Sequence, residues 1–162
     1  MTNEILYKLA ARAGKLLKTR KLMLVTAESC TGGGVGEAVT MVPGSSDWYE
    51  RGFITYTYIS KRELLGIKRQ TLDKFGAVSE QTTREMAAGA LKNSHAQVAV
   101  AVSGTAGPSG GTPDKPVGTI CLAWCLKNGA MVSETRRFNG NRQTIRRKAV
   151  MRALQGILEM LE

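Results

Sequence analysis

Two short apolar segments, each followed by a loop rich in Gly, Ser and Thr, constrain the fold more than any other feature. Residues Leu22–Ala27 (LMLVTA) and Val98–Val102 (VAVAV) have no polar face, which is typical of strands buried on both sides. The loops that follow them are residues 28–34 (ESCTGGG) and 103–112 (SGTAGPSGGT). Because ligands bind beyond the carboxyl ends of strands in α/β sheets, the two loops are predicted to border a ligand site.

Helical and strand-like segments alternate along the rest of the chain. Apolar spacing and N-cap residues predict helices over residues 1–20, 34–41, 61–66, 71–75, 79–92 (capped by Ser79) and 141–161 (capped by Asn141). Further strands are expected at Phe53–Tyr58, 119–126 and 131–138, the last two joined in a hairpin by Asn128-Gly129. The alternation predicts an α/β or α+β domain with helices covering a central sheet.

Length and charge narrow the class of protein. The chain has 162 residues, which suits one domain, and a formal net charge of +10, which favours an anionic partner. The net charge is the only feature that would favour a nucleic-acid partner. Because the sequence has no recognisable nucleic-acid-binding motif, we do not expect that partner. No segment resembles a secretory signal or a membrane span, so we expect a soluble cytoplasmic protein without a membrane partner.

The scarcity of metal ligands limits the chemistry. The chain has three cysteines and a single histidine, His95, so a Cys/His zinc site is not expected. A catalytic serine needs a base, and with one histidine a lysine of lowered pKa is the obvious candidate. Ser46, Tyr56 and Lys61 lie close in sequence and could form such a group. They could equally be a helix cap, a sheet aromatic and a surface lysine.

Several motifs make the sequence similar to a known family. They are Thr26–Gly33 (TAESCTGG), Pro43–Ser46 (PGSS), Arg51–Phe53 (RGF), Gly76–Ser79 (GAVS), Ala106–Pro108 (AGP) and Lys115–Gly118 (KPVG). From about Glu4 to the end of the chain, these segments resemble, in the same order, the stand-alone members of the CinA C-terminal domain family.

The resemblance implies a fold and an activity. The implied fold is a single three-layer α/β/α domain over residues 1–162, with a central mixed sheet flanked by helices. The implied activity is hydrolysis of a phosphorylated nucleotide, nicotinamide mononucleotide, to nicotinate mononucleotide and ammonia. No metal or other cofactor takes part in that reaction, and the family resemblance also implies a homodimer.

The resemblance also assigns roles to individual residues. Ser46 would attack the carboxamide, neutral Lys61 would accept its proton, and Tyr56 would relay it to the departing ammonia. Ser29 is the alternative nucleophile. The residues expected to bind substrate are Thr31, Gly32, Gly33, Ser103, Gly104, Thr105, Ala106, Gly107 and Arg142.

The sequence departs from the family pattern beside the expected base. Tyr58 and Ile59 stand where related members commonly have an amide and a carboxylate, and Asn141 replaces a common aspartate before Arg142. Loss of the carboxylate would lower the pKa of Lys61, whereas Tyr58 could instead fill the pocket. The alternative function is therefore a nucleotide-binding paralogue that is catalytically inactive or acts on an altered substrate.

Overall fold

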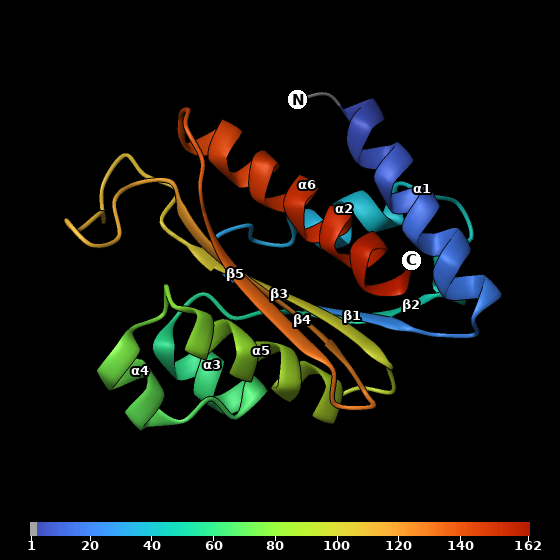
Figure 1. The fold of residues 1–162 in the computed structure, drawn as a ribbon, viewed down its shortest axis with the longest axis horizontal. Helices are drawn as coiled ribbons and strands as arrows, with labels where there is room; N and C mark the ends of the chain where they lie inside the picture. The colour runs from blue at the N-terminus through green and yellow to red at the C-terminus, as the bar shows by residue number, and fades with distance from the viewer. Residues whose placement is uncertain (1–2) are drawn as a thin grey trace.

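The computed structural model describes residues 3–162, which contain a five-stranded mixed sheet (Figure 1). Its strands are β1 (Leu24–Glu28), β2 (Tyr49–Ile54), β3 (Val98–Gly104), β4 (Thr119–Leu126) and β5 (Met131–Arg137). They lie in the order β2-β1-β3-β4-β5. Because β1 runs parallel to both β2 and β3, the carboxyl ends of these three strands meet at one edge of the sheet. β3, β4 and β5 pair antiparallel.

Helices cover both faces of the sheet, so the three-layer α/β/α arrangement is confirmed (Figure 1). One face carries α1 (Asn3–Thr19), α2 (Gly34–Thr40) and α6 (Arg142–Leu161). The other face carries α3 (Tyr58–Leu65), α4 (Arg69–Phe75) and α5 (Glu80–Lys92). The two short apolar segments of the sequence form β1 and β3, which are neighbours inside the sheet and lie between the two layers of helices.

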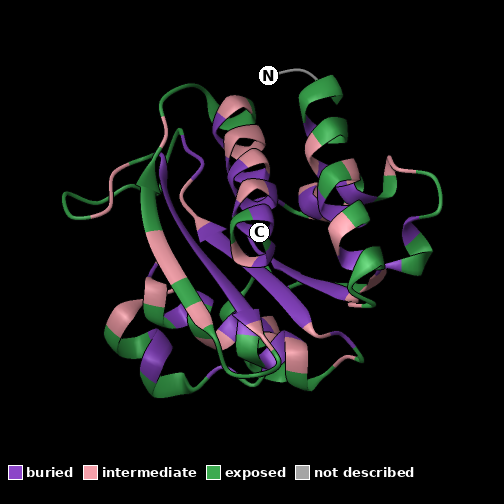
Figure 2. Cartoon of the chain, turned by 45° about the vertical axis from the view of Figure 1, so that its right-hand side comes forward, coloured by how far each residue is buried: buried purple, intermediate pink, exposed green. Residues whose placement is uncertain are grey.

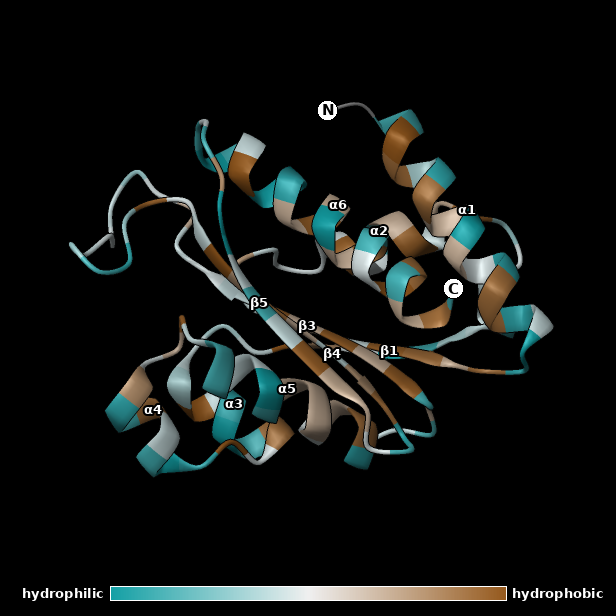
Figure 3. Ribbon diagram, viewed as in Figure 1, coloured by the Kyte–Doolittle hydropathy of each residue, from teal (hydrophilic) through white to brown (hydrophobic). Residues whose placement is uncertain are grey.

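The core forms on both sides of the central strands. All five residues of β1 are buried, as are the first six of β3 (Figure 2). Val100 and Val102 pack into the cluster formed with α1 and α6, whereas Ala99 and Ala101 pack into the cluster beneath α5. Figure 3 shows apolar strands between helices whose outward surfaces are hydrophilic. Burial on both faces explains why these strands are continuous apolar runs in the sequence.

The strand expected at Phe53–Tyr58 is shifted in the structure. β2 occupies Tyr49–Ile54, and Tyr58 is already the first residue of α3. The reason is a capping box at Thr57: its Oγ1 accepts a hydrogen bond from Ser60 N (3.2 Å), and Ser60 Oγ accepts one from Thr57 N (3.0 Å). The box outweighs the strand preference of the aromatic residues and places Lys61 in the first turn of α3.

The starts of α5 and α6 and the hairpin agree with the sequence-based expectations, whereas α4 begins at Arg69, two residues before the expected start at Thr71. Ser79 Oγ accepts from Thr82 N at the start of α5, and Asn141 Oδ1 accepts from Thr144 N at the start of α6. β4 and β5 form the antiparallel hairpin around Asn128-Gly129. Within residues 3–162, no helix is both long enough and apolar enough to cross a bilayer.

Candidate active site

The carboxyl ends of three parallel strands bring polar residues together. Ser29, which follows β1, donates its backbone N–H to Val102 O of β3 (2.9 Å). Thr55, which follows β2, donates its N–H to Glu28 O (2.9 Å). The backbone thus continues to pair just beyond the strands and holds Ser29 between the ends of β2 and β3. This is the edge of the sheet at which the sequence predicted a ligand site.

Lys61 reaches this edge from α3 and contacts Ser29. Its Nζ lies 3.0 Å from Ser29 Oγ and donates a hydrogen bond to Thr55 O at 2.7 Å. Lys61 is 1% exposed, so its amine is held away from bulk water. Burial lowers the pKa of the Lys61 ammonium from 10.5 to about 8. A lysine of this pKa is partly neutral near neutral pH and can accept the proton of a serine hydroxyl.

The structure does not bring Ser46 to Lys61. Ser46 is exposed and lies in the 3-10 turn Ser45–Asp47, directly before β2, whereas Lys61 follows the other end of that strand. The six residues of β2 separate the two by roughly 20 Å, at about 3.3 Å per residue. Ser29, the alternative nucleophile, is the serine that the structure brings to the lysine.

Glu28 organises the loop that carries Ser29. Its buried carboxylate accepts hydrogen bonds from Thr31 Oγ1 (2.5 Å) and from the backbone N–H groups of Val35 (2.9 Å) and Gly36 (3.1 Å). It therefore pins the turn after β1 to the start of α2. Gly32 and Gly33 complete this turn with φ of 59° and 102°, a region that favours glycine. Glu28 lies inside the TAESCTGG motif, but sequence reasoning gave it no role.

Replacing Glu28 by alanine is expected to lower the free energy of unfolding by about 3 kcal/mol, because three buried donors lose their acceptor. Urea denaturation would measure the change. Glu37→Ala, which removes an exposed carboxylate from the same segment, is the matched control and should shift stability by less than about 0.5 kcal/mol. Equal effects of the two substitutions would contradict this role for Glu28.

Two arginines of α6 approach the loops. Arg146 Nε donates to Cys30 O (3.0 Å) and its guanidinium also donates to Thr31 O (3.2 Å). Arg142, expected to bind substrate, donates to Gly107 O (2.8 Å) and to the Tyr56 hydroxyl (3.0 Å). Arg146 thus supports the serine loop, a role that the helical spacing of the basic residues could not reveal. Arg142 joins Tyr56 to the loop after β3.

The loop after β3 borders the same edge. Ser103 is 1% exposed and ends the buried part of β3, and Gly104–Gly107 follows it. Thr105 is fixed by backbone hydrogen bonds, donating to Thr119 O and accepting from Gly118 N. Thr31, Gly32 and Gly33 follow Ser29 in the turn after β1, the strand next to β3. The structure therefore gathers the expected substrate-binding residues at one edge, and of the expected catalytic residues only Ser46 lies elsewhere.

The departures from the family pattern lie at the first turn of α3 and at the start of α6. Tyr58 and Ile59 are 49% and 62% exposed, whereas Lys61 is 1% exposed. Asn141 caps α6 through its side-chain oxygen, as an aspartate would.

The cysteine at this edge is a poor candidate for the nucleophile. Burial and the nearby Glu28 carboxylate raise the pKa of the Cys30 thiol to about 12, so the thiol stays protonated near neutral pH and is a poor nucleophile. Across the described residues 3–162, no three His, Cys, Asp or Glu side chains gather as metal ligands would.

Comparison with known proteins agrees with the motifs. The model of the CinA C-terminal domain matches residues 6–161. The chain is 48% identical to nicotinamide-nucleotide amidohydrolase PncC of Pseudomonas putida, and the alignment covers 94% of each chain. It is 45% identical to the protein of the same name from Escherichia coli K12, and that alignment covers 96% of this chain and 94% of the relative. The crystal structure of the competence/damage inducible protein CihA from Agrobacterium tumefaciens superimposes with a TM-score of 0.96 at 43% identity, covering 98% and 96% of the two chains. The chain belongs to the CinA C-terminal domain family.

Proposed function

We propose that this protein hydrolyses the carboxamide of nicotinamide mononucleotide to give nicotinate mononucleotide and ammonia. The observation that carries the proposal is the buried contact between Lys61 Nζ and Ser29 Oγ at the carboxyl ends of the strands. The names of the relatives that match over nearly the whole chain supply the substrate. Together, a nucleophile–base pair and an amide substrate define an amidohydrolase.

The reaction proceeds through an acyl-enzyme on Ser29. Neutral Lys61 accepts the hydroxyl proton while Ser29 Oγ attacks the carboxamide carbon. The proton then passes to the amide nitrogen, the C–N bond breaks and ammonia leaves, with the acyl group of nicotinate mononucleotide, ribose and phosphate included, held as an ester on Ser29. Lys61 next accepts a proton from water, whose oxygen attacks the ester. Return of that proton to Ser29 Oγ releases nicotinate mononucleotide.

The contacts around Lys61 suit this proton transfer. Thr55 O accepts one N–H of the amine, which directs the rest of the group toward Ser29. We assign stabilisation of the oxyanion to backbone N–H groups of the turns at Thr31–Gly33 and Gly104–Gly107 other than those of Gly32 and Thr105, which donate to Ser29 O and Thr119 O. Such an interaction is commonly worth about 3 kcal/mol per donor. Ser103 completes the polar lining beside Ser29.

Tyr56 and Arg142 stand at the mouth of the site. Tyr56 directly follows Thr55, and its hydroxyl is held by Arg142. This position suits a residue that contacts the substrate and passes protons at the entrance. We assign both residues to the substrate-facing part of the site.

The proposal also includes the cellular location and the oligomeric state of the protein. A cytoplasmic location suits Cys30, Cys121 and Cys125, which are all buried free thiols. A homodimer is proposed on the family resemblance.

An ammonia assay tests the function. Purified protein incubated with nicotinamide mononucleotide should release ammonia and nicotinate mononucleotide in equal amounts, as measured by enzyme-coupled detection and chromatography. Binding of the nucleotide without ammonia release would contradict hydrolysis and favour the inactive nucleotide-binding paralogue. Nicotinamide released in place of ammonia would point to cleavage of the glycosidic bond.

A further inference from the structure

A row of polar side chains crosses the sheet from the candidate active site. Ala101 of β3 and Ala123 of β4 face α5, so Ser103 and Cys121, two positions away on the same strands, face the same side. Ser103 is paired with Cys121 in the register, and Cys121 with Thr135 of β5. Ser29 lies beside Ser103, because its N–H is bonded to Val102 O. The row therefore leads from Ser29 across β3 to β4 and β5.

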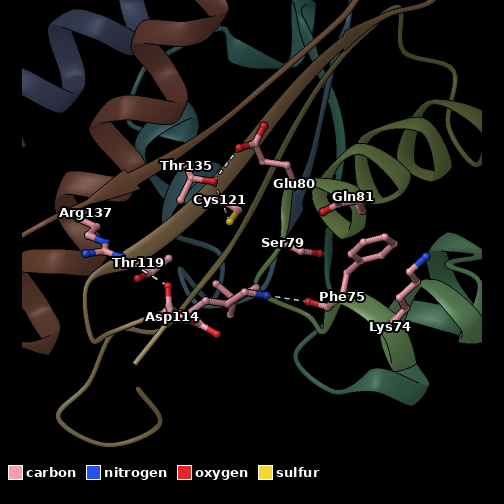
Figure 4. A pocket seen from close by; sticks show the side chains of 12 residues that line it. Lys74, Phe75, Ser79, Glu80, Gln81, Asp114, Thr119, Cys121, Thr135 and Arg137 are labelled. Atoms are coloured by element: carbon pink, nitrogen blue, oxygen red, sulfur yellow. Dashed lines mark hydrogen bonds between the residues drawn. The ribbon is translucent and has the colours of Figure 1, made fainter. Parts of the chain in front are cut away.

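A cavity of about 580 Å³ opens at the far end of this row. Figure 4 shows it between the end of α4, the start of α5 and the ends of β4 and β5. Its lining includes Phe75, Glu80, Lys115, Thr119, Cys121 and Arg137. The volume is within the range of small-molecule sites. Strands in a sheet are about 4.8 Å apart, and β4 lies two strands away from β1, so β4 is roughly 10 Å from Ser29. This distance is similar to the length of a mononucleotide from its carboxamide to its phosphate.

The charges at this cavity favour an anion. Lys74, Lys115 and Arg137 line it, against Glu80 and Asp114. The Glu80 carboxylate accepts hydrogen bonds from the Ser133 and Thr135 hydroxyls at 2.9 and 2.8 Å, of which Figure 4 shows the one to Thr135. Three cationic side chains therefore face two carboxylates, which leaves the lining with a net positive charge.

The two basic side chains nearest the loop after β3 keep donors free. Lys115 Nζ donates to Phe75 O at 2.7 Å, and the Arg137 guanidinium donates to Asp114 O at 3.4 Å. An ammonium has three N–H donors and a guanidinium five, so both groups keep donors for a ligand.

We propose that this cavity binds the phosphate of the mononucleotide whose carboxamide is hydrolysed at Ser29, with Arg137 and Lys115 as the phosphate-binding residues. The inference rests on the proposed function and extends it from the reacting amide to the other end of the substrate. Arg142, the residue that the family resemblance suggested for binding substrate, donates to Gly107 O and to the Tyr56 hydroxyl, and we place it with Tyr56 at the carboxamide end of the substrate.

The test compares nicotinamide mononucleotide with nicotinamide riboside, which lacks the phosphate. Arg137→Ala and Lys115→Met should each lower kcat/KM for the mononucleotide about 10- to 100-fold, the effect of losing a charge-assisted hydrogen bond, and leave the riboside within about twofold. Arg137 is exposed, so its replacement should not disturb folding. Arg20→Ala and Lys127→Met, both at exposed positions outside the cavity, are the matched controls.

Three results would overturn the assignment. The first is a wild type that does not distinguish the two substrates. The second is an equal loss on both substrates in the Arg137 and Lys115 variants. The third is a phosphate-selective loss in Arg142→Ala and not in Arg137→Ala.

Failure of the proposed function would be seen separately, as no ammonia from either compound. Calorimetric binding of the mononucleotide and the riboside then decides the inference. Tighter binding of the mononucleotide that Arg137→Ala abolishes supports a phosphate site in the cavity, whereas equal binding of the two compounds rejects it.

Discussion

Ser29→Ala lowers the rate of ammonia release from nicotinamide mononucleotide about a thousandfold or more, because the acyl-enzyme can no longer form. Ser29 Oγ is the hydroxyl that lies 3.0 Å from the buried amine of Lys61. The substitution removes one oxygen and leaves the backbone hydrogen bond to Val102 O intact. Steady-state assays, with circular dichroism to confirm folding, would measure the effect.

Ser46→Ala is the control for this experiment. Ser46 lies at the opposite end of β2, so its replacement should leave the rate within about twofold of the wild type. Mass spectrometry of enzyme quenched during turnover should find the acyl adduct of nicotinate mononucleotide on the peptide containing Ser29. An adduct on Ser46, or a large loss of activity in Ser46→Ala alone, would show that the nucleophile has been assigned wrongly.

Lys61→Met is expected to lower kcat/KM about 100- to 10,000-fold through loss of the general base. The wild-type pH profile should reveal the same group. Burial lowers the pKa of Lys61 to about 8, and only its neutral form accepts a proton. The rate should therefore rise about tenfold per pH unit below that pKa and level off above it. Residual activity in Lys61→Met should lose this dependence.

The matched control is Lys68→Met, which removes an exposed amine close to α3. It should leave both the rate and the pH profile unchanged. A wild-type rate that falls as pH rises toward 8, or a Lys61→Met variant that keeps the wild-type profile, would exclude Lys61 as the base.

The elements of the fold could largely be predicted from short-range patterns. Ser79 and Asn141 identify the starts of α5 and α6 because a side-chain oxygen satisfies a free N–H at the helix start. The error at β2 and α3 arose because Tyr56 and Tyr58 favour a strand, while the capping box at Thr57 favours a helix. Both signals are local, and composition alone did not show which one prevails.

The candidate site was predicted only in part. The two glycine-rich loops correctly indicated the edge of the sheet at which Ser29, Thr31 and Ser103 gather. Ser46 was the first choice of nucleophile because the family resemblance assigned it that role and because it lies close to Lys61 in sequence. That closeness is misleading, since an extended strand carries the chain from one edge of the sheet to the other.

The sequence by itself determined the helices, the buried strands, the hairpin, the family and the residue types available for catalysis, because each depends on neighbouring residues or on a motif. The tertiary structure decided which serine meets Lys61, how Glu28 and Arg146 hold its loop, and where the cavity lined by Arg137 lies relative to it. These relations join residues far apart in the chain. They depend on the order and direction of the strands, which are established by packing of the whole domain and not by local patterns.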